Sequence, residues 1–334
     1  MRFLVNFILR IGIIELFLLF FVLVNVAAAF LYVYTKKERL LYLFTLACGG
    51  IGTCLGMLFT KSKPKSRALK IITAIGLVIA VIPIVHIAHG LTLDRIIRYI
   101  EIEFTAENWP AELDGYRIAF MTDMHTISDE TMRAVASELN QRSIDLLVLG
   151  GDFTTRDSHY QGTLREIANV VTTDGIFGVE GNHDCYIRLF YAMAQHEITP
   201  LDNSGVHVRD GFYLAGVHDM WNRSPDIAEA IAGAYPGDFV LLISHNPDIA
   251  MVQPMDGVDL MLSGHTHNGQ ITFFGFPMYL FRGSITAYGA RFAYGFSYSA
   301  DGTPVFVSKG IGPYYTIPRI FARPEVVIFT MVRG

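Results

Sequence analysis

The chain has 334 residues and a formal net charge of −5, and the charge is divided unevenly along it. Residues 1–90 contain 10 Lys or Arg and 2 Asp or Glu, whereas residues 91–334 contain 16 and 29. An acidic soluble portion repels the phosphate backbone of nucleic acids, so we expect no nucleic-acid partner. Small or lipid-linked phosphates remain candidate ligands, and the three cysteines do not form a disulfide framework.

Three apolar stretches, at about 11–34, 40–60 and 71–89, occupy the first ninety residues. Each has the roughly 20 residues that a helix needs to cross a bilayer, so we expect residues 1–90 to form a membrane domain with three transmembrane helices. A cleaved signal peptide is the alternative for the first stretch, but its apolar run is too long for one. The second stretch contains glycines that indicate close helix packing and not a ligand site, namely Gly49, Gly50, Gly52 and Gly56.

Positive residues around these stretches predict the orientation. Seven Lys or Arg lie on the side of Arg2 and five on the side of Lys36, which favours a cytoplasmic N-terminus. An odd number of spans then gives a multi-pass cell-membrane protein with its catalytic domain outside. Glu15 and Asn25 are polar within the first stretch, but no partner cation lies in the other stretches, which disfavours transport or proton relay.

The segment from Lys36 to Ser66 resembles a small bacterial membrane-protein family of unknown function. The likeness lies in an ordered pattern of residues: an ER pair, then a GG pair, then a further G. Ser62 and Lys63 stand where that family has a His-Lys pair. The resemblance therefore implies no activity.

The chain changes character after the third apolar stretch. We expect a linker at 91–99 and a catalytic domain at 100–334, which opens on the half-buried strand pattern of Ile100–Phe104. From Tyr116 onward, short buried strands alternate with amphipathic helices, and beyond residue 237 strand patterns dominate. This order predicts an α/β architecture with two sheets packed face to face and flanked by helices.

Polar clusters follow several of these predicted strands, at the position where α/β folds commonly bind ligands. Taken singly, each cluster is a common turn, and two histidines on alternate strand positions are unremarkable. The combination is more specific. The clusters are Asp123-Met124-His125, Gly151-Asp152, Gly181-Asn182-His183-Asp184, Ser244-His245-Asn246 and Gly264-His265-Thr266-His267.

In this order, DxH, GD, GNHD, H and GHxH resemble the signature of the calcineurin-like metallophosphoesterases. The resemblance implies a four-layer αββα sandwich and two divalent metal ions of the Mn, Fe or Zn class, which carboxylate and imidazole ligands suit. The ligands that it implies are Asp123, His125 and His267 on one metal, Asn182, His245 and His265 on the other, and Asp152 as a bridge.

Two further residues of the GNHD motif take catalytic roles by the same resemblance. His183 would face the phosphate, where it would stabilise charge or protonate the leaving oxygen. Asp184 would orient His183 as a supporting partner. Cys185, the next residue, is interpreted as structural, because no environment that activates a thiol can be read around it.

Three longer segments resemble a membrane-associated bacterial subgroup of this family, which includes exported phosphoesterases and some UDP-2,3-diacylglucosamine hydrolases. The segments are PAELDGYRIAFMTDMH, SGHTHNGQ and VSKGIGPYYTIPRIFARPEVVIF, and the likeness covers about 235 residues. Thr155 stands where the subgroup often has Asp, which puts local geometry in question. The other departures are not predicted ligands, namely Thr122, Met124, Thr126 and Asn268.

We therefore expect a membrane-anchored, dinuclear metal-dependent phosphoesterase. It would hydrolyse a phosphate ester or anhydride, lipid-linked or envelope-associated, by attack of metal-bound hydroxide. One alternative is a UDP-2,3-diacylglucosamine pyrophosphate hydrolase, whose substrate is cytoplasmic and so conflicts with the predicted orientation. The other is a non-catalytic membrane sensor of metal or phosphate, against which the complete ligand set argues.

The sequence leaves several properties open. It does not distinguish monoesters from diesters as substrates, and it does not fix the oligomeric state. Four aromatic residues fit an apolar substrate site and the core equally well, namely Tyr191, Trp221, Phe281 and Tyr314.

Overall fold

The computed structural model describes residues 13–34, 45, 50–60, 67–125, 127–155, 160–277, 285–314 and 317–334. The chain forms two compact units, Met1–Ala88 and His89–Gly334. Several features predicted from the sequence lie outside the described residues: most of the Lys36–Ser66 segment, the positive flanks at Arg2 and Lys36, the side chain of Glu15, and Phe281.

The described residues of the first unit form the helices α2 (Ile13–Tyr34), α4 (Gly50–Thr60) and most of α5 (Arg67–Leu91). The helices α2 and α4 lie against each other at Gly52, whose backbone N–H donates to the side-chain oxygen of Asn25 at 2.7 Å. A Cβ at Gly52 would lie 1.8 Å from the carbonyl oxygen of Asn25, so this contact requires glycine. The expected packing role of this glycine is therefore observed.

Among the described residues, one helix is long and apolar enough to cross a membrane. The sequence had predicted three such helices. Lys70–Arg95 is long and apolar enough to cross a bilayer, and Phe20–Leu31 is a shorter apolar helix. Much of the predicted second stretch lies outside the described residues. Along α5, exposed positions carry large apolar side chains such as Ile75, Val78 and Val81, which favour a lipid environment.

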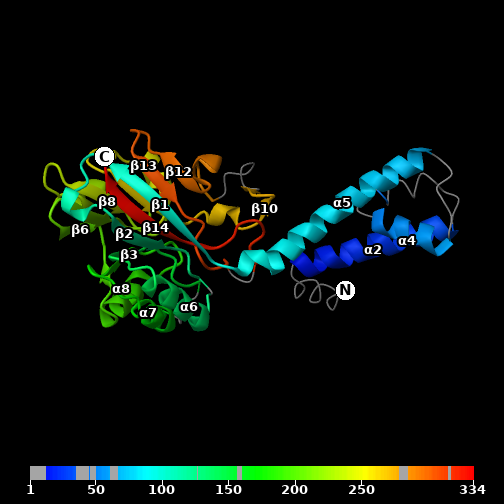
Figure 1. Ribbon diagram of the computed structural model, residues 1–334, viewed down its shortest axis with the longest axis horizontal. Helices are drawn as coiled ribbons and strands as arrows, with labels where there is room; N and C mark the ends of the chain where they lie inside the picture. Colours follow the sequence, from blue (N-terminus) through cyan, green and yellow to red (C-terminus); the bar gives the residue numbers. More distant parts are fainter. Residues whose placement is uncertain are drawn as a thin grey trace. The chain divides into compact units, whose positions relative to one another are not determined.

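The second unit is built on two six-stranded sheets (Figure 1). In the first sheet the spatial order is β1 (Arg98–Ala106), β14 (Glu325–Arg333), β2 (Tyr116–Met121), β3 (Leu146–Leu149), β4 (Ile176–Gly178) and β5 (Thr199–Pro200). In the second sheet it is β12 (Gly295–Tyr298), β13 (Pro304–Val307), β9 (Leu260–Ser263), β8 (Phe239–Ile243), β7 (Phe212–Gly216) and β6 (Ser204–Arg209).

Most neighbouring strands are parallel. The chain pairs β2 with β3, β3 with β4 and β4 with β5 in parallel, and it does the same for β7, β8 and β9. The strand β14 is parallel to β1 and antiparallel to β2, so it lies between the first two strands of the unit. A small antiparallel hairpin, β10 (Thr272–Phe273) and β11 (Phe276–Pro277), stands apart from both sheets.

Helices α6 (Asp129–Asn140), α7 (Tyr160–Ile167) and α8 (Tyr186–Gln195) cover the first sheet, where they lie together in Figure 1. The helix α6 begins after Ser128, whose hydroxyl accepts from the N–H of Thr131. Its buried face follows helical spacing from Met132 to Leu139. Among the described residues, the far side of the second sheet carries short turns, α9 (Ile227–Ala230), η4 (Pro247–Met251) and η7 (Gly289–Phe292).

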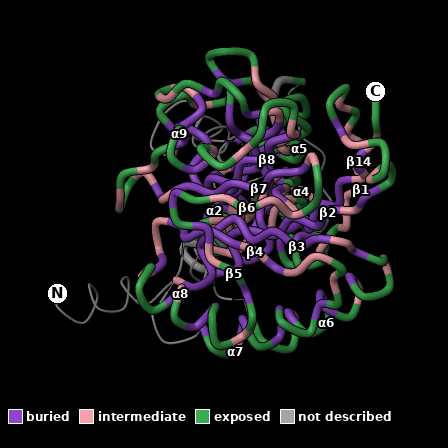
Figure 2. Tube along the Cα trace, turned by 90° about the vertical axis from the view of Figure 1, so that its left-hand side faces the viewer, coloured by how far each residue is buried: buried purple, intermediate pink, exposed green. Residues whose placement is uncertain are grey.

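Three apolar cores hold these layers together. One lies between α6–α8 and the first sheet, one between the two sheets, and one beneath the short turns. Figure 2 shows the buried residues concentrated along the strands. The mixed α/β sandwich that the sequence predicts is confirmed. In the part of the chain that the structure describes, the outer layer on the second sheet consists of short turns. The remaining short elements are η2 (Leu93–Arg95), η3 (Ala111–Leu113) and η5 (His267–Gly269).

This topology brings the polar clusters together. The parallel strands β2, β3 and β4 end at one edge of the first sheet, just before Asp123, Asp152 and Asn182. The parallel strands β8 and β9 end just before His245 and His265. Because the carboxyl ends of parallel strands lie at the same edge, one site receives residues from both sheets.

Candidate metal centre

Four buried residues offer ligand atoms that all lie within 4.8 Å of one another: Asp123, His125, Asp152 and His267. The Nε2 atoms of His125 and His267 are 2.9 Å apart, and His267 Nε2 is 3.2 Å from Asp123 Oδ1. Ligand atoms bound at right angles to one ion, at about 2.1 Å each, lie about 3 Å apart. The separations therefore fit a divalent metal ion.

A second group lies on the other side of Asp152. The Oδ1 of Asn182 is 2.8 Å from His265 Nδ1 and 3.2 Å from His245 Nε2. Asp152 Oδ2 is 3.3 Å from His245 Nε2 and 3.5 Å from His125 Nε2, so it faces both groups. The structure thus brings together all seven residues that the sequence predicts as ligands.

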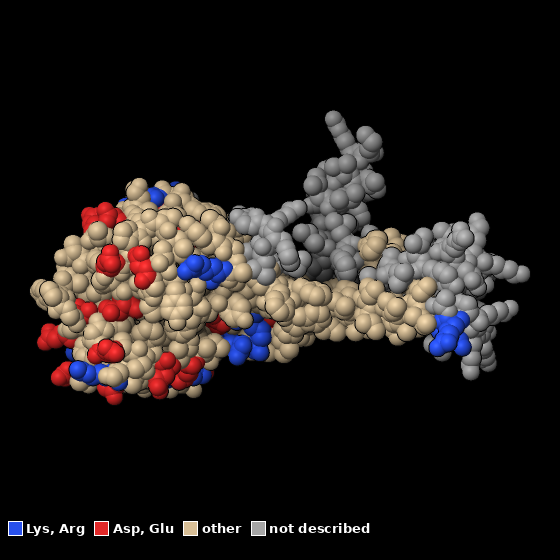
Figure 3. Space-filling view, turned by 90° about the horizontal axis from the view of Figure 1, so that it is seen from above, with Lys and Arg blue, Asp and Glu red and all other residues tan. Residues whose placement is uncertain are grey.

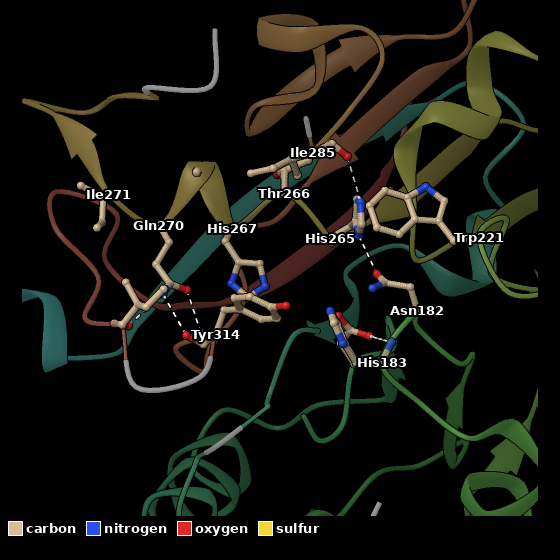
Figure 4. Close-up of a pocket in the computed structure, with 13 residues that line it drawn as sticks. Asn182, His183, Trp221, His265, Thr266, His267, Gln270, Ile271, Ile285 and Tyr314 are labelled. Atoms are coloured by element: carbon tan, nitrogen blue, oxygen red, sulfur yellow. Dashed lines mark hydrogen bonds between the residues drawn. The ribbon is translucent and has the colours of Figure 1, made fainter. Parts of the chain in front are cut away.

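Backbone carbonyls fix which nitrogen of two of these histidines faces the site. His245 Nδ1 lies 2.8 Å from the carbonyl oxygen of Gly150, and His265 Nε2 lies 3.0 Å from that of Ile285 (Figure 4). A carbonyl only accepts, so in each ring the N–H points away from the site. The opposite nitrogen of each ring therefore faces the Oδ1 of Asn182 and the space between the candidate ligands.

Charge and burial oppose each other at the carboxylates. Burial works to raise the pKa of Asp123 and of Asp152, but the imidazoles of His267 and His245 outweigh it, so both pKa values are lowered. Burial lowers the pKa of His125 to about 3 and that of His265 to about 4. The two carboxylates are therefore anionic, and the His125 and His265 rings neutral, at neutral pH, which are the forms in which these side chains bind metals.

His245 is the exception among the buried rings. Burial alone would lower its pKa, but the Asp152 carboxylate raises it well above the ordinary value. A proton on the Nε2 of His245 and a metal compete for the same lone pair.

Residues 116–269 match the family of calcineurin-like phosphoesterases, and this range contains all seven candidate ligands. The chain contains a calcineurin-like metallophosphoesterase domain. The ordered motifs had indicated this family, and that interpretation is confirmed.

Related proteins carry similar names. An uncharacterized metallophosphoesterase of Helicobacter pylori (strain ATCC 700392 / 26695) is 30% identical over 226 residues, 64% of this chain and 58% of the relative. A transmembrane protein with metallophosphoesterase domain of Danio rerio is 27% identical over 317 residues, 85% and 69% of the two chains. Phosphodiesterase YaeI of Escherichia coli is 28% identical over 246 residues, 65% and 82%. The chain spans 58% of the length of the first of these relatives.

The two predicted catalytic residues of the metallophosphoesterase domain lie on either side of the Asp152 loop. His183 donates its backbone N–H to Asp152 Oδ1 at 2.9 Å, and its half-buried ring faces the cavity. The buried carboxylate of Asp184 accepts from the backbone N–H groups of Gly181, Asp152 and Phe153. These bonds connect Asp184 to the backbone that carries the bridging position, and not to the His183 ring.

Thr155 supplies a contact of the kind that the missing Asp would give. Its hydroxyl lies 3.3 Å from the Nδ1 of His125, and the Nε2 of the same ring faces the site. His125 therefore still has a polar partner, although Thr155 replaces the Asp of the subgroup pattern.

Five candidate ligands adopt left-handed backbone conformations, which non-glycine residues rarely do: Asp123, His125, Asp152, His265 and His267. Such strain persists only where the surroundings fix the backbone, and it is common at functional sites. Gly312 packs closely against the backbone of the DMH motif, which carries two of these five residues, Asp123 and His125. A Cβ at Gly312 would lie 1.8 Å from the carbonyl oxygen of Met124, in the middle of the DMH motif.

We predict that Gly312→Ala lowers the free energy of unfolding by about 2–3 kcal/mol, because the methyl group displaces the Met124 backbone. It should also reduce metal content, since Asp123 and His125 move with that backbone. Urea denaturation and metal analysis test this. The control is Gly237→Ala, where φ is +97° but nothing lies within 4 Å of the added methyl group. A variant no less stable than this control would contradict the prediction.

Arg319 is a residue of the site that sequence reasoning missed. Its buried guanidinium donates to the carbonyl oxygens of Gly312 and Ala322, and its Nη2 lies 3.1 Å from the Nδ1 of His267. Burial lowers its pKa to about 10. The signal was present as an Arg inside the apolar IPRIFARPE run, where a buried cation demands a structural reason.

A cavity of about 350 Å³ opens beside the candidate ligands (Figure 4). Its remaining wall is largely apolar and includes Trp221, Ile271, Tyr314 and Ile317. Trp221 is 55% exposed and lies edge-on to His265 at 4.6 Å, so it belongs to the cavity and not to the core. Tyr191 is exposed and does not line the cavity.

Proposed function

We propose that the metallophosphoesterase domain hydrolyses phosphate esters or anhydrides with two divalent ions. The observation that carries this is the position of Asp152, whose Oδ2 faces His125 of one ligand group and His245 of the other. The first ion would take Asp123, His125 and His267, and the second Asn182, His245 and His265. Two ions held by these residues, with Asp152 between them, would act together on a single phosphoryl group.

Bound divalent ions supply Lewis acidity and lower the pKa of water toward neutrality. The side chains of the protein supply proton transfer and positioning. His183 stands at the cavity next to Asp152, where its imidazole can donate a proton to the leaving oxygen. We propose that Asp184 serves His183 indirectly: three amide bonds hold the loop that positions the His183 backbone.

We also propose that the domain is anchored in a membrane, with residues 1–90 as membrane domain, 91–99 as linker and 100–334 as catalytic domain. The apolar helix Lys70–Arg95 and the similarity to a protein named as transmembrane support anchoring. A lipid-linked phosphate is then the favoured substrate, because the apolar cavity wall suits an amphiphile. The hydrolase of the nucleotide lipid and the non-catalytic sensor remain the two alternatives.

Hydrolysis of p-nitrophenyl phosphate and bis-p-nitrophenyl phosphate by the full chain in detergent tests the activity. We expect turnover with Mn that EDTA abolishes and that added Mn restores. Binding of two metal ions without turnover of either ester would favour the sensor. A chain that binds no metal would overturn the proposed centre.

A reporter fused after Gly334 tests the orientation. The positive residues predict an extracytoplasmic domain, so an alkaline-phosphatase fusion in a bacterial host should be active and a green-fluorescent-protein fusion dark. The reverse result would place the catalytic domain in the cytoplasm. It would also remove the main objection to the nucleotide-lipid substrate.

A further inference from the structure

The catalytic unit exposes apolar side chains at two segments that lie far apart in the sequence. Just after α5, Leu91, Leu93 and Ile96 are exposed. On the β10–β11 hairpin, Phe273 is 50% and Phe276 69% exposed. We call these five residues the interfacial patch. Large apolar side chains at such exposure are costly in water and indicate a contact surface.

Contacts at Asp94 and Phe321 join the two segments of the interfacial patch. The Asp94 carboxylate lies 2.7 Å from both the Nδ1 of His89 and the backbone N of Phe321, whose ring stacks on His89 at 3.9 Å. The hairpin is attached to the same segment, because Thr272 N donates to the carbonyl oxygen of Ile320 at 2.9 Å. The hairpin is thus fixed to the last residues of α5.

Positive charge accompanies the interfacial patch. Arg95 and Arg98 are exposed beside its first segment, and Arg323 Nη2 contacts the carbonyl oxygen of Ile96. None of these three arginines forms an ion pair with a described residue. Asp and Glu side chains are nevertheless spread over the face of the unit that Figure 3 shows. Apolar side chains next to arginines are the composition of surfaces that bind anionic lipid headgroups.

The interfacial patch also adjoins the cavity of the candidate metal centre. Ile271 and Gln270 line the cavity and directly precede the hairpin. Gln270 accepts from the N–H of Ile320 and donates through its side chain to the carbonyl oxygen of Ile317, another cavity residue. One wall of the cavity is therefore built from the segments that carry and anchor the hairpin.

We propose that the interfacial patch lies in the headgroup region of the bilayer that α5 enters, and that the cavity receives phosphates of membrane amphiphiles from that surface. This rests on the proposed function for the hydrolysis and on α5 for the anchoring. The last residues of α5 stand at the bilayer surface if the helix crosses it, and the contacts above hold the hairpin beside those residues. An amphiphile then reaches the metals without leaving the membrane, along Ile271 and Ile317.

The first test measures contact with lipid directly. Full-length Phe276→Trp is reconstituted in phosphatidylglycerol vesicles whose lipids are brominated near the headgroup end of the acyl chain, and the unsubstituted chain gives the background of Trp109 and Trp221. Tyr235→Trp is the matched control, because Tyr235 is 68% exposed on the loop before β8. We expect about half of the added emission to be quenched at 276 and none at 235. Equal emission of Phe276→Trp in brominated and ordinary vesicles would overturn the proposal.

The second test separates lipid presentation from catalysis. Two esters share one reacting group, water-soluble ethyl p-nitrophenyl phosphate and vesicle-bound hexadecyl p-nitrophenyl phosphate. Phe273→Ser/Phe276→Ser should lower kcat/KM for the hexadecyl ester about tenfold and leave the ethyl ester unchanged. Equal losses for both esters, or none for either, would contradict a role in lipid presentation. If the unsubstituted chain hydrolyses neither ester, it does not act on these diesters, and the quenching test alone decides the patch.

Discussion

Replacing Asp152 by Asn should lower kcat/KM for bis-p-nitrophenyl phosphate by at least about a thousandfold. Asn keeps the size of Asp and can still accept from the N–H of His183, so the loop is preserved. What it loses is the negative charge that faces His125 and His245 at 3.5 and 3.3 Å. Without that charge one oxygen no longer neutralises two cations, and we expect the metal content to fall below two per chain.

The control for this variant is Asp210→Asn, which removes an exposed carboxylate far along the chain from every candidate ligand. Metal analysis accompanies the kinetics, so that loss of metal is distinguished from loss of reactivity. Asp152→Asn with two bound metals and unchanged turnover would show that this carboxylate does not bridge the ions.

Replacing His183 by Gln should lower kcat by about 10²- to 10⁴-fold while both metals stay bound. The backbone N–H of His183, which contacts Asp152, is kept in this variant, and only the imidazole is lost. The size of the effect should depend on the leaving group. A p-nitrophenolate leaves readily as an anion, whereas an alkoxide requires a proton, so alkyl esters should suffer the larger loss.

His196→Gln provides the matched control, because His196 lies at the C-terminal end of α8 and its ring bonds to Gln161. Kinetics over a series of leaving groups are measured for both variants. An equal loss for aryl and alkyl esters would indicate that His183 stabilises charge and does not donate the proton.

The sequence allowed the candidate site to be predicted because its chemistry is local. Each ligand type follows a strand within a few residues, and parallel strands bring their carboxyl ends together whatever the details of packing. The α/β class followed from the alternation of strands and helices, and β1 was visible as the IEIEF alternation. These features depend on short-range patterns, which is why they were accessible.

Long-range contacts could not be predicted in the same way. Arg319 lies 52 residues from His267, and nothing in the local sequence indicates that its guanidinium contacts that ring. Asp184 looked like a partner for the adjacent His183, but the turn directs its carboxylate to backbone amides. The exposure of Phe273 and Phe276 also depends on how the hairpin is attached to residues near 320, which periodicity does not encode.

The pairing of β1 with β14 constrains the order in which the domain can be completed. Residues 98–106 pair with residues 325–333, a separation of 227 positions, and β14 also supplies the neighbour of β2. At about 5–20 residues per second, a ribosome needs roughly 10–45 s to travel between these strands. Until β14 has been synthesised, the backbone N–H and C=O groups along the edges of β1 and β2 have no partner strand. They can then pair with other chains. A tether at the membrane would keep such half-made domains apart from one another during that interval.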